Sequence, residues 1–75
     1  MKKAEVQLWL SKHESSFVTY DWISIGSIEY EEHADNEAIK EKIRALVDAS
    51  EHKPFINAAR LKLQTGEKIT MTSVF

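Results

Sequence analysis

Residues 36–51 read NEAIKEKIRALVDASE, and they form the one segment of the chain with a clear helical period. Its apolar residues recur at the spacing of one helix face: Ile39, Ile43, Leu46 and Val47. A helix of this length is marginal in water by itself. We therefore expect the rest of the chain to bury this apolar stripe.

Local sequence signals mark both ends of the helix. Asp35 and Asn36 are residue types whose side chains accept a hydrogen bond from the first turn. Pro54 excludes the helical conformation for Lys53, so the helix is predicted to end near Glu51 or His52.

Before the helix, residues 4–10 alternate between apolar and polar side chains and predict a half-buried strand. The even residues should face the helix, which leaves Trp9 on the opposite face of the sheet. Residues 11–16 are polar and predict a connection of hairpin length.

Residues 17–32 are rich in β-branched and aromatic side chains and also predict strand structure. Val18, Tyr20 and Trp22 share one parity, Ile23 and Ile25 take the other, and Ile28 and Tyr30 return to the first. An unbroken regular strand cannot satisfy this pattern. We predict a bulge or sharp bend between Trp22 and Gly26, within either one long bent strand or two strands at 17–22 and 24–30.

The last part of the chain predicts a second hairpin. Its loop, Gln-Thr-Gly at residues 64–66, puts Gly66 where hairpins of this kind need a left-handed residue. The implied pairs are Leu61 with Ile69, Ala59 with Met71, Asn57 with Ser73, and Phe55 with Phe75. This register sets apolar residues opposite apolar ones and polar opposite polar.

Together these elements predict an α+β fold: a small antiparallel sheet of four to five strands, in β-β-α-β-β order, with one helix packed on one face. At 75 residues, the chain should form a single compact domain over residues 1–75. The other face of the sheet is then uncovered, and its expected side chains are Glu5, Gln7, Trp9, Arg60, Lys62, Lys68, Thr70 and Thr72.

Composition narrows the functional classes. The chain has no cysteine, which excludes disulfides, thiolate zinc sites and thiol catalysis. A formal net charge of −2 is too small to indicate that the whole surface binds a polyanion. Glu5 and Gln7 interrupt any signal-peptide core, and no apolar run reaches membrane-spanning length, so we expect a cytoplasmic protein without membrane contact.

No catalytic or ligand-binding motif is present. His13, His33 and His52 lack the spacing of metal ligands on a helix. Ser27 lacks both glycines of a Gly-x-Ser-x-Gly nucleophile elbow, because Ile25 and Glu29 occupy those positions, and two glycines are too few for a phosphate-binding loop. We therefore expect no enzymatic activity, no cofactor and no metal site.

The first of two binding hypotheses concerns the acidic segment before the helix. Its carboxylates are Glu29, Glu31, Glu32, Asp35 and Glu37, with no lysine or arginine among them. Acidic residues favour a helix N-terminus, which accounts for Asp35 and Glu37. Glu29, Glu31 and Glu32 need another reason, and a docking patch for a basic partner is one.

The second hypothesis concerns the uncovered sheet face with Trp9, Arg60 and Lys62. Aromatic and basic residues on an open sheet can hold single-stranded nucleic acid, although an ordinary solvated face has the same composition. Self-association through Trp9, or through the apolar residues Val74 and Phe75, is a third use of these surfaces.

We expect a non-enzymatic domain that binds another protein through the acidic segment or the uncovered face. Compact accessory or inhibitory proteins of phages and mobile elements fit this description, although no residue marks that origin. The alternative is a single-stranded nucleic-acid-binding module.

Overall fold

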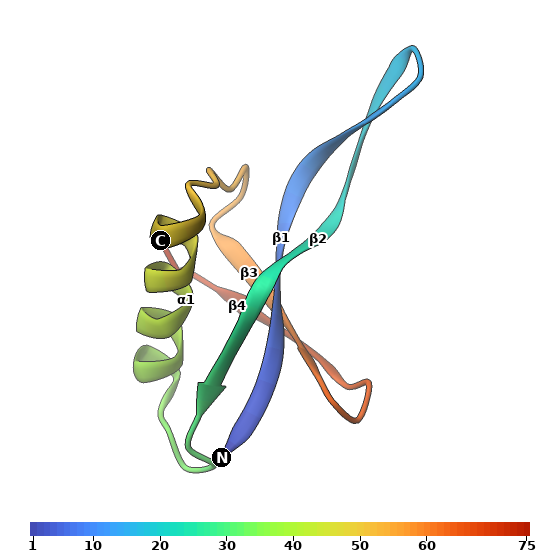
Figure 1. Ribbon diagram of the computed structural model, residues 1–75. Helices are drawn as coiled ribbons and strands as arrows, with labels where there is room; N and C mark the ends of the chain where they lie inside the picture. The colour runs from blue at the N-terminus through green and yellow to red at the C-terminus, as the bar shows by residue number, and fades with distance from the viewer.

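The computed structural model describes residues 1–75 as one antiparallel sheet with a helix on one of its faces (Figure 1). Its elements in chain order are β1 (Lys2–Glu14), β2 (Phe17–Tyr30), α1 (Asn36–Ser50), β3 (Ala58–Leu63) and β4 (Lys68–Thr72). The strands lie in the order β2-β1-β3-β4, so β2 and β4 form the two edges. This arrangement confirms the predicted α+β fold with β-β-α-β-β order.

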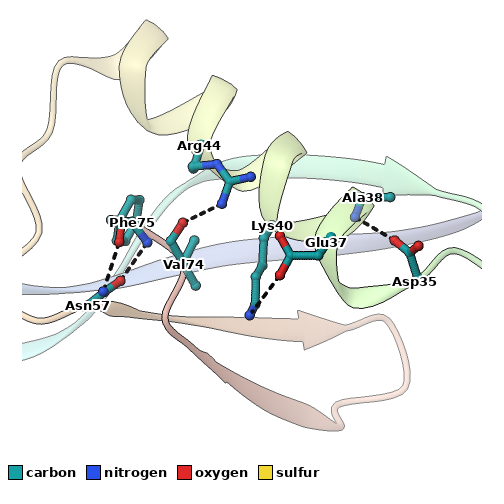
Figure 2. A network of polar contacts seen from close by, with 8 residues as sticks. All are labelled: Asp35, Glu37, Ala38, Lys40, Arg44, Asn57, Val74 and Phe75. Atoms are coloured by element: carbon teal, nitrogen blue, oxygen red, sulfur yellow. Dashed lines mark hydrogen bonds and ion pairs between the residues drawn. The ribbon is translucent and has the colours of Figure 1, made fainter.

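The helix α1 begins and ends close to where the sequence places it. The Asp35 carboxylate accepts a hydrogen bond of 2.8 Å from the Ala38 N–H (Figure 2). Glu51 adopts the left-handed conformation, with φ 59°, and its N–H donates to the Asp48 carbonyl. Both ends are thus capped, and the helix ends at Ser50, one or two residues before the predicted end at Glu51 or His52.

The core lies between α1 and the sheet face that it covers. Ile39, Ile43 and Val47 are buried, and Leu46 is half-buried beside them. The sheet contributes Ala4, Val6, Leu8 and Leu10 from β1, Ile28 and Tyr30 from β2, Ala59 and Leu61 from β3, and Met71 from β4. The prediction that the helical stripe packs against the even residues of the first strand is confirmed.

β2 is one continuous strand that contains a bulge. The β1–β2 register shifts between Val6 and Gln7, and Ile25 is left as an extra residue without a partner. Gly26 follows it with φ 146°, and a Cβ at this position would lie 3.2 Å from a methyl group of Leu46. The predicted bulge is confirmed, in the form of one long bent strand.

β1 is longer than its alternating pattern indicates. The predicted connection over residues 11–16 is wrong, because β1 continues to Glu14 and turns only at Ser15, which has φ 53°. Pairing with the strand-prone start of β2 keeps these polar residues in the ladder. Since β1 pairs with β3 only as far as Gln7, residues 11–20 form a two-stranded hairpin arm that projects from the body (Figure 1).

The hairpin of β3 and β4 has the predicted loop and central register. Leu61 pairs with Ile69, and Ala59 pairs with Met71. Gly66 has φ 91°, the positive value for which glycine is suited. The prediction is confirmed for these residues.

The two outer pairs predicted for this hairpin are not ladder pairs. Ser73 has φ 53°, which turns the chain out of the strand, although its N–H still donates to the Asn57 carbonyl at 2.9 Å. The Asn57 side chain accepts from the Phe75 N–H at 2.6 Å and donates to the Phe75 carbonyl at 2.9 Å (Figure 2). The predicted pairing of Phe55 with Phe75 is wrong, because Phe55 packs against Tyr20 instead.

Val74 is buried within its own chain. Its carbonyl accepts a hydrogen bond of 2.7 Å from Nη1 of Arg44 on α1 (Figure 2). Val74 is therefore not exposed for contact with another chain, whereas Phe75 is 42% exposed.

Candidate functional site

The sheet face that α1 does not cover, here called the open face, carries a cluster of aromatic rings. Trp9 of β1 pairs with Trp22 of β2, and their rings meet edge to face with centroids 5.5 Å apart. The Tyr20 ring lies 6.5 Å from Trp9 at an interplanar angle of 12°, and Phe55 meets Tyr20 edge-on at 5.4 Å. Stacked and edge-on contacts are the arrangements that aromatic pairs prefer.

Arg60 of β3 completes this group of side chains. Its guanidinium carbon lies 4.9 Å from the centroid of the Trp22 ring. Its Nε donates to Gln7 at 2.9 Å, and the amide of Gln7 donates to Glu5 at 3.2 Å. Because Gln7 is almost fully buried, this row of hydrogen bonds fixes the plane of the guanidinium.

The two Nη groups of Arg60 have no hydrogen bond to another residue, so they can bind an acceptor from outside. We name the whole group the aromatic–arginine cluster; it consists of Trp9, Tyr20, Trp22, Phe55 and Arg60.

Basic residues outnumber acidic ones on the open face. The ladder registers place Lys3, Arg60, Lys62 and Lys68 there, against Glu5 and Glu29. The whole chain carries a net charge of −2, so this face has the opposite sign from the molecule. Such a face attracts acidic groups.

The hairpin arm extends the exposed apolar surface beyond the cluster. Val18 is 49% exposed on the open face next to Tyr20 of the cluster, which is 50% exposed, and Phe17 is 56% exposed on the opposite face of the arm. Near the tip, the Lys12 ammonium lies 3.0 Å from the Glu14 carboxylate, and this hydrogen-bonded ion pair raises the pKa of Lys12 above its usual value. Large apolar residues exposed together on a small protein are typical of a binding surface.

Three of the predicted partner-binding residues, Trp9, Arg60 and Lys62, lie on the open face as expected. Glu29 lies on the same face but far from the rings, opposite Lys3 in the ladder. Glu29 thus has a lysine as its cross-strand neighbour.

The remaining acidic residues do not form one patch. Asp35 caps α1, and the Glu37 carboxylate lies 3.6 Å from the Lys40 ammonium. Glu31 and Glu32 are exposed in the connection between β2 and α1. The acidic segment is thus divided between helix stabilisation and two free carboxylates.

Three aromatic residues of the open face were not predicted there: Tyr20, Trp22 and Phe55. Trp22 and Ile28 have the same parity, but the bulge at Ile25 places them on opposite faces. The parity change in the sequence indicated this bulge without indicating which half would face the helix. Phe55 reaches the open face because the β3 ladder begins only after it.

The three histidines, His13, His33 and His52, lie on separate segments. No three His, Asp or Glu side chains gather closely enough to hold a metal ion. The surface has four open depressions of about 190 to 310 Å³. The single helix is shorter and less apolar than a helix that crosses a membrane.

Comparisons with known proteins identified no relative: no protein-family model matches the sequence, and no match was found among curated proteins or solved structures.

Proposed function

We propose that this chain is a small, non-enzymatic protein-binding domain, of the accessory or inhibitory kind, that docks its partner on the open face. The aromatic–arginine cluster is the observation that supports this function. Tryptophan, tyrosine and arginine are the residues that most often contribute binding energy at protein interfaces. Here all three types are contiguous on a surface that the chain leaves uncovered.

The chemistry of the cluster describes the partner segment that it fits. An apolar side chain would cover the rings of Trp9 and Tyr20, and an acidic side chain would reach the free Nη groups of Arg60. Lys62 beside them adds positive charge. Because Gln7 already holds the guanidinium, little conformational entropy is lost on binding.

Intrinsic fluorescence gives a direct test. The only two tryptophans of the chain, Trp9 and Trp22, both belong to the cluster, so their emission reports on anything that covers it. Proteins captured from a cell lysate by the immobilised chain would be purified and titrated against it in solution. We expect a saturable change in emission, and affinity lower by about tenfold or more for Tyr20→Ser and for Arg60→Gln.

Matched variants elsewhere on the surface locate the binding site. Lys42→Gln changes an exposed residue of α1 and should leave the affinity unchanged. The triple variant Glu29→Lys, Glu31→Lys, Glu32→Lys tests the acidic segment. If this triple variant loses the partner while Tyr20→Ser and Arg60→Gln keep it, the open face is not the docking surface.

A second candidate function is the binding of single-stranded nucleic acid. It is favoured by one observation: the nearly parallel rings of Trp9 and Tyr20 lie on the same face as Arg60, Lys62 and Lys68. Bases stack on such rings while cations hold the phosphates.

The same fluorescence assay tests this candidate with an oligothymidylate. Quenching that weakens steeply between about 50 and 200 mM salt would support it. If adding the oligothymidylate leaves the tryptophan emission unchanged at both salt concentrations, this candidate function is excluded.

A further inference from the structure

β2 forms one edge of the sheet and has no strand on its outer side (Figure 1). Its first eight residues, FVTYDWIS at 17–24, precede the bulge, and we call them the β2 edge segment. The opposite edge, β4, has only five residues and carries Lys68. An unpaired row of backbone N–H and C=O groups is a template for another strand.

The β2 edge segment lacks most features that prevent such pairing. It contains no lysine, arginine or proline, and the bulge at Ile25 lies beyond its end. Phe17, Val18 and Tyr20 are exposed along it. Its one charged residue is Asp21, whose carboxylate accepts the N–H of Trp22 at 2.7 Å, so the carboxylate must release this N–H before the N–H can donate to a partner strand.

We propose that this segment binds a second copy of the same chain, by antiparallel pairing in which Tyr20 lies opposite its own counterpart. A twofold axis perpendicular to the sheet relates the copies, so both open faces lie on the same side. The two four-stranded sheets then become one continuous sheet. The proposal concerns the sheet edge and does not depend on the function proposed for the open face.

The self-complementarity of the sequence selects this register. On the open face it sets Val18 opposite Trp22 and Tyr20 opposite Tyr20; on the other face it sets Phe17 opposite Ile23 and Thr19 opposite Asp21. Apolar residues thus meet apolar or aromatic ones. The Thr19 hydroxyl, which donates to the Lys12 carbonyl at 3.4 Å within the chain, can donate instead to the Asp21 carboxylate of the second copy.

Neighbouring registers lose this match. If the partner slides by two residues in one direction, Asp21 lies opposite its own counterpart and two carboxylates oppose each other. If it slides by two residues in the other direction, Phe17 lies opposite Asp21. A slide of one residue would set side chains of opposite faces against each other.

Sedimentation velocity of the full chain tests whether the pair forms. A single strand pair buries a small area, so we expect the average mass to rise from 8.6 kDa toward twice that value between about 10 μM and 1 mM. A chain that stays at the monomer mass throughout this range would overturn the proposal.

Charge variants at Thr19 test the register. Thr19→Lys sets an ammonium opposite Asp21 twice per dimer and should tighten the dimer about fivefold; Thr19→Asp should weaken it by a similar factor. Thr70→Lys and Thr70→Asp on the other edge strand are matched controls and should have no effect.

Dimerisation that ignores the Thr19 variants, or that responds to Thr70, would contradict pairing through the β2 edge segment. Far-UV circular dichroism would verify that each variant is folded. If Thr19→Asp does not fold, Thr19→Lys still tests the proposal, because the proposed register requires this variant to dimerise more tightly than the parent chain.

Discussion

The guanidinium carbon of Arg60 lies 4.9 Å from the centre of the Trp22 ring, although β1 separates the strands that carry these two residues. The contact connects β3 to β2 across the open face, and Gln7 of the intervening strand accepts the Arg60 Nε–H. One arginine thus links three strands on the face that has no helix to stabilise it.

Arg60→Gln should lower the free energy of unfolding by about 1–2 kcal/mol, because it removes both the cation–π contact and the hydrogen bond to Gln7. Arg60→Lys keeps the charge but not the planar group, so it should recover only part of this loss. Urea unfolding followed by circular dichroism measures both values. Lys62→Gln, on the same strand, should stay within about 0.5 kcal/mol of the parent chain; an equal loss there would refute a specific role for Arg60.

Gly26→Ala should destabilise the chain by about 1–3 kcal/mol. The substitution meets a positive φ of 146° and a methyl group of Leu46 at 3.2 Å. Gly66→Ala is a matched control, because its φ of 91° is also positive but nothing lies within 4 Å of the added Cβ. Denaturant unfolding should show the larger loss at Gly26, and equal losses would mean that the Leu46 contact costs nothing.

Asp35→Ala should cost about 0.5–2 kcal/mol, because the Ala38 N–H loses its acceptor. Asp35→Asn keeps a side-chain oxygen at the cap and should cost much less. Thermal unfolding at 222 nm, a wavelength sensitive to helix, would compare the two with Glu32→Ala, which lies outside the helix. A similar loss in Glu32→Ala would indicate a charge effect rather than capping.

Amide hydrogen exchange should separate the hairpin arm from the body. The arm pairs through one ladder only and buries few side chains, whereas residues 4–7 of β1 are bonded on both sides and lie over the core. We expect exchange in residues 11–14 to be faster by at least about tenfold, measured by NMR at low protein concentration. Uniform protection along β1 would show that the arm is as stable as the sheet.

The parts of the fold that were predicted are those where burial enforces a period. Ile39, Ile43 and Val47 face the core because no other side of α1 is apolar, and the alternation of residues 4–10 follows from the same requirement. The hairpin arm has little buried surface, so its polar residues carry no such pattern. Residues 11–14 of β1 are in a strand because they pair with residues 17–20 of β2, and this pairing cannot be predicted from the sequence of β1 by itself.

The open face was predictable where the ladder is regular. Trp9 and Arg60 could be assigned to it from alternation alone, because no irregularity separates them from the core residues of their strands. Tyr20 and Trp22 lie on the far side of a bulge, and Phe55 lies outside any strand. Their positions depend on contacts between distant segments, which a single sequence does not reveal.

Because Ile25 has no partner in β1, the alternation of side chains between the two faces of the sheet changes parity at this residue of β2. The even-numbered residues Ile28 and Tyr30 lie on the face that α1 covers, whereas the even-numbered residues Tyr20 and Trp22 lie on the open face. Without the extra residue, both aromatic rings would lie on the same face of the sheet as Ile28, and Ile23 would lie on the open face. One extra residue in β2 therefore determines whether the solvent-exposed face of this small protein carries aromatic rings.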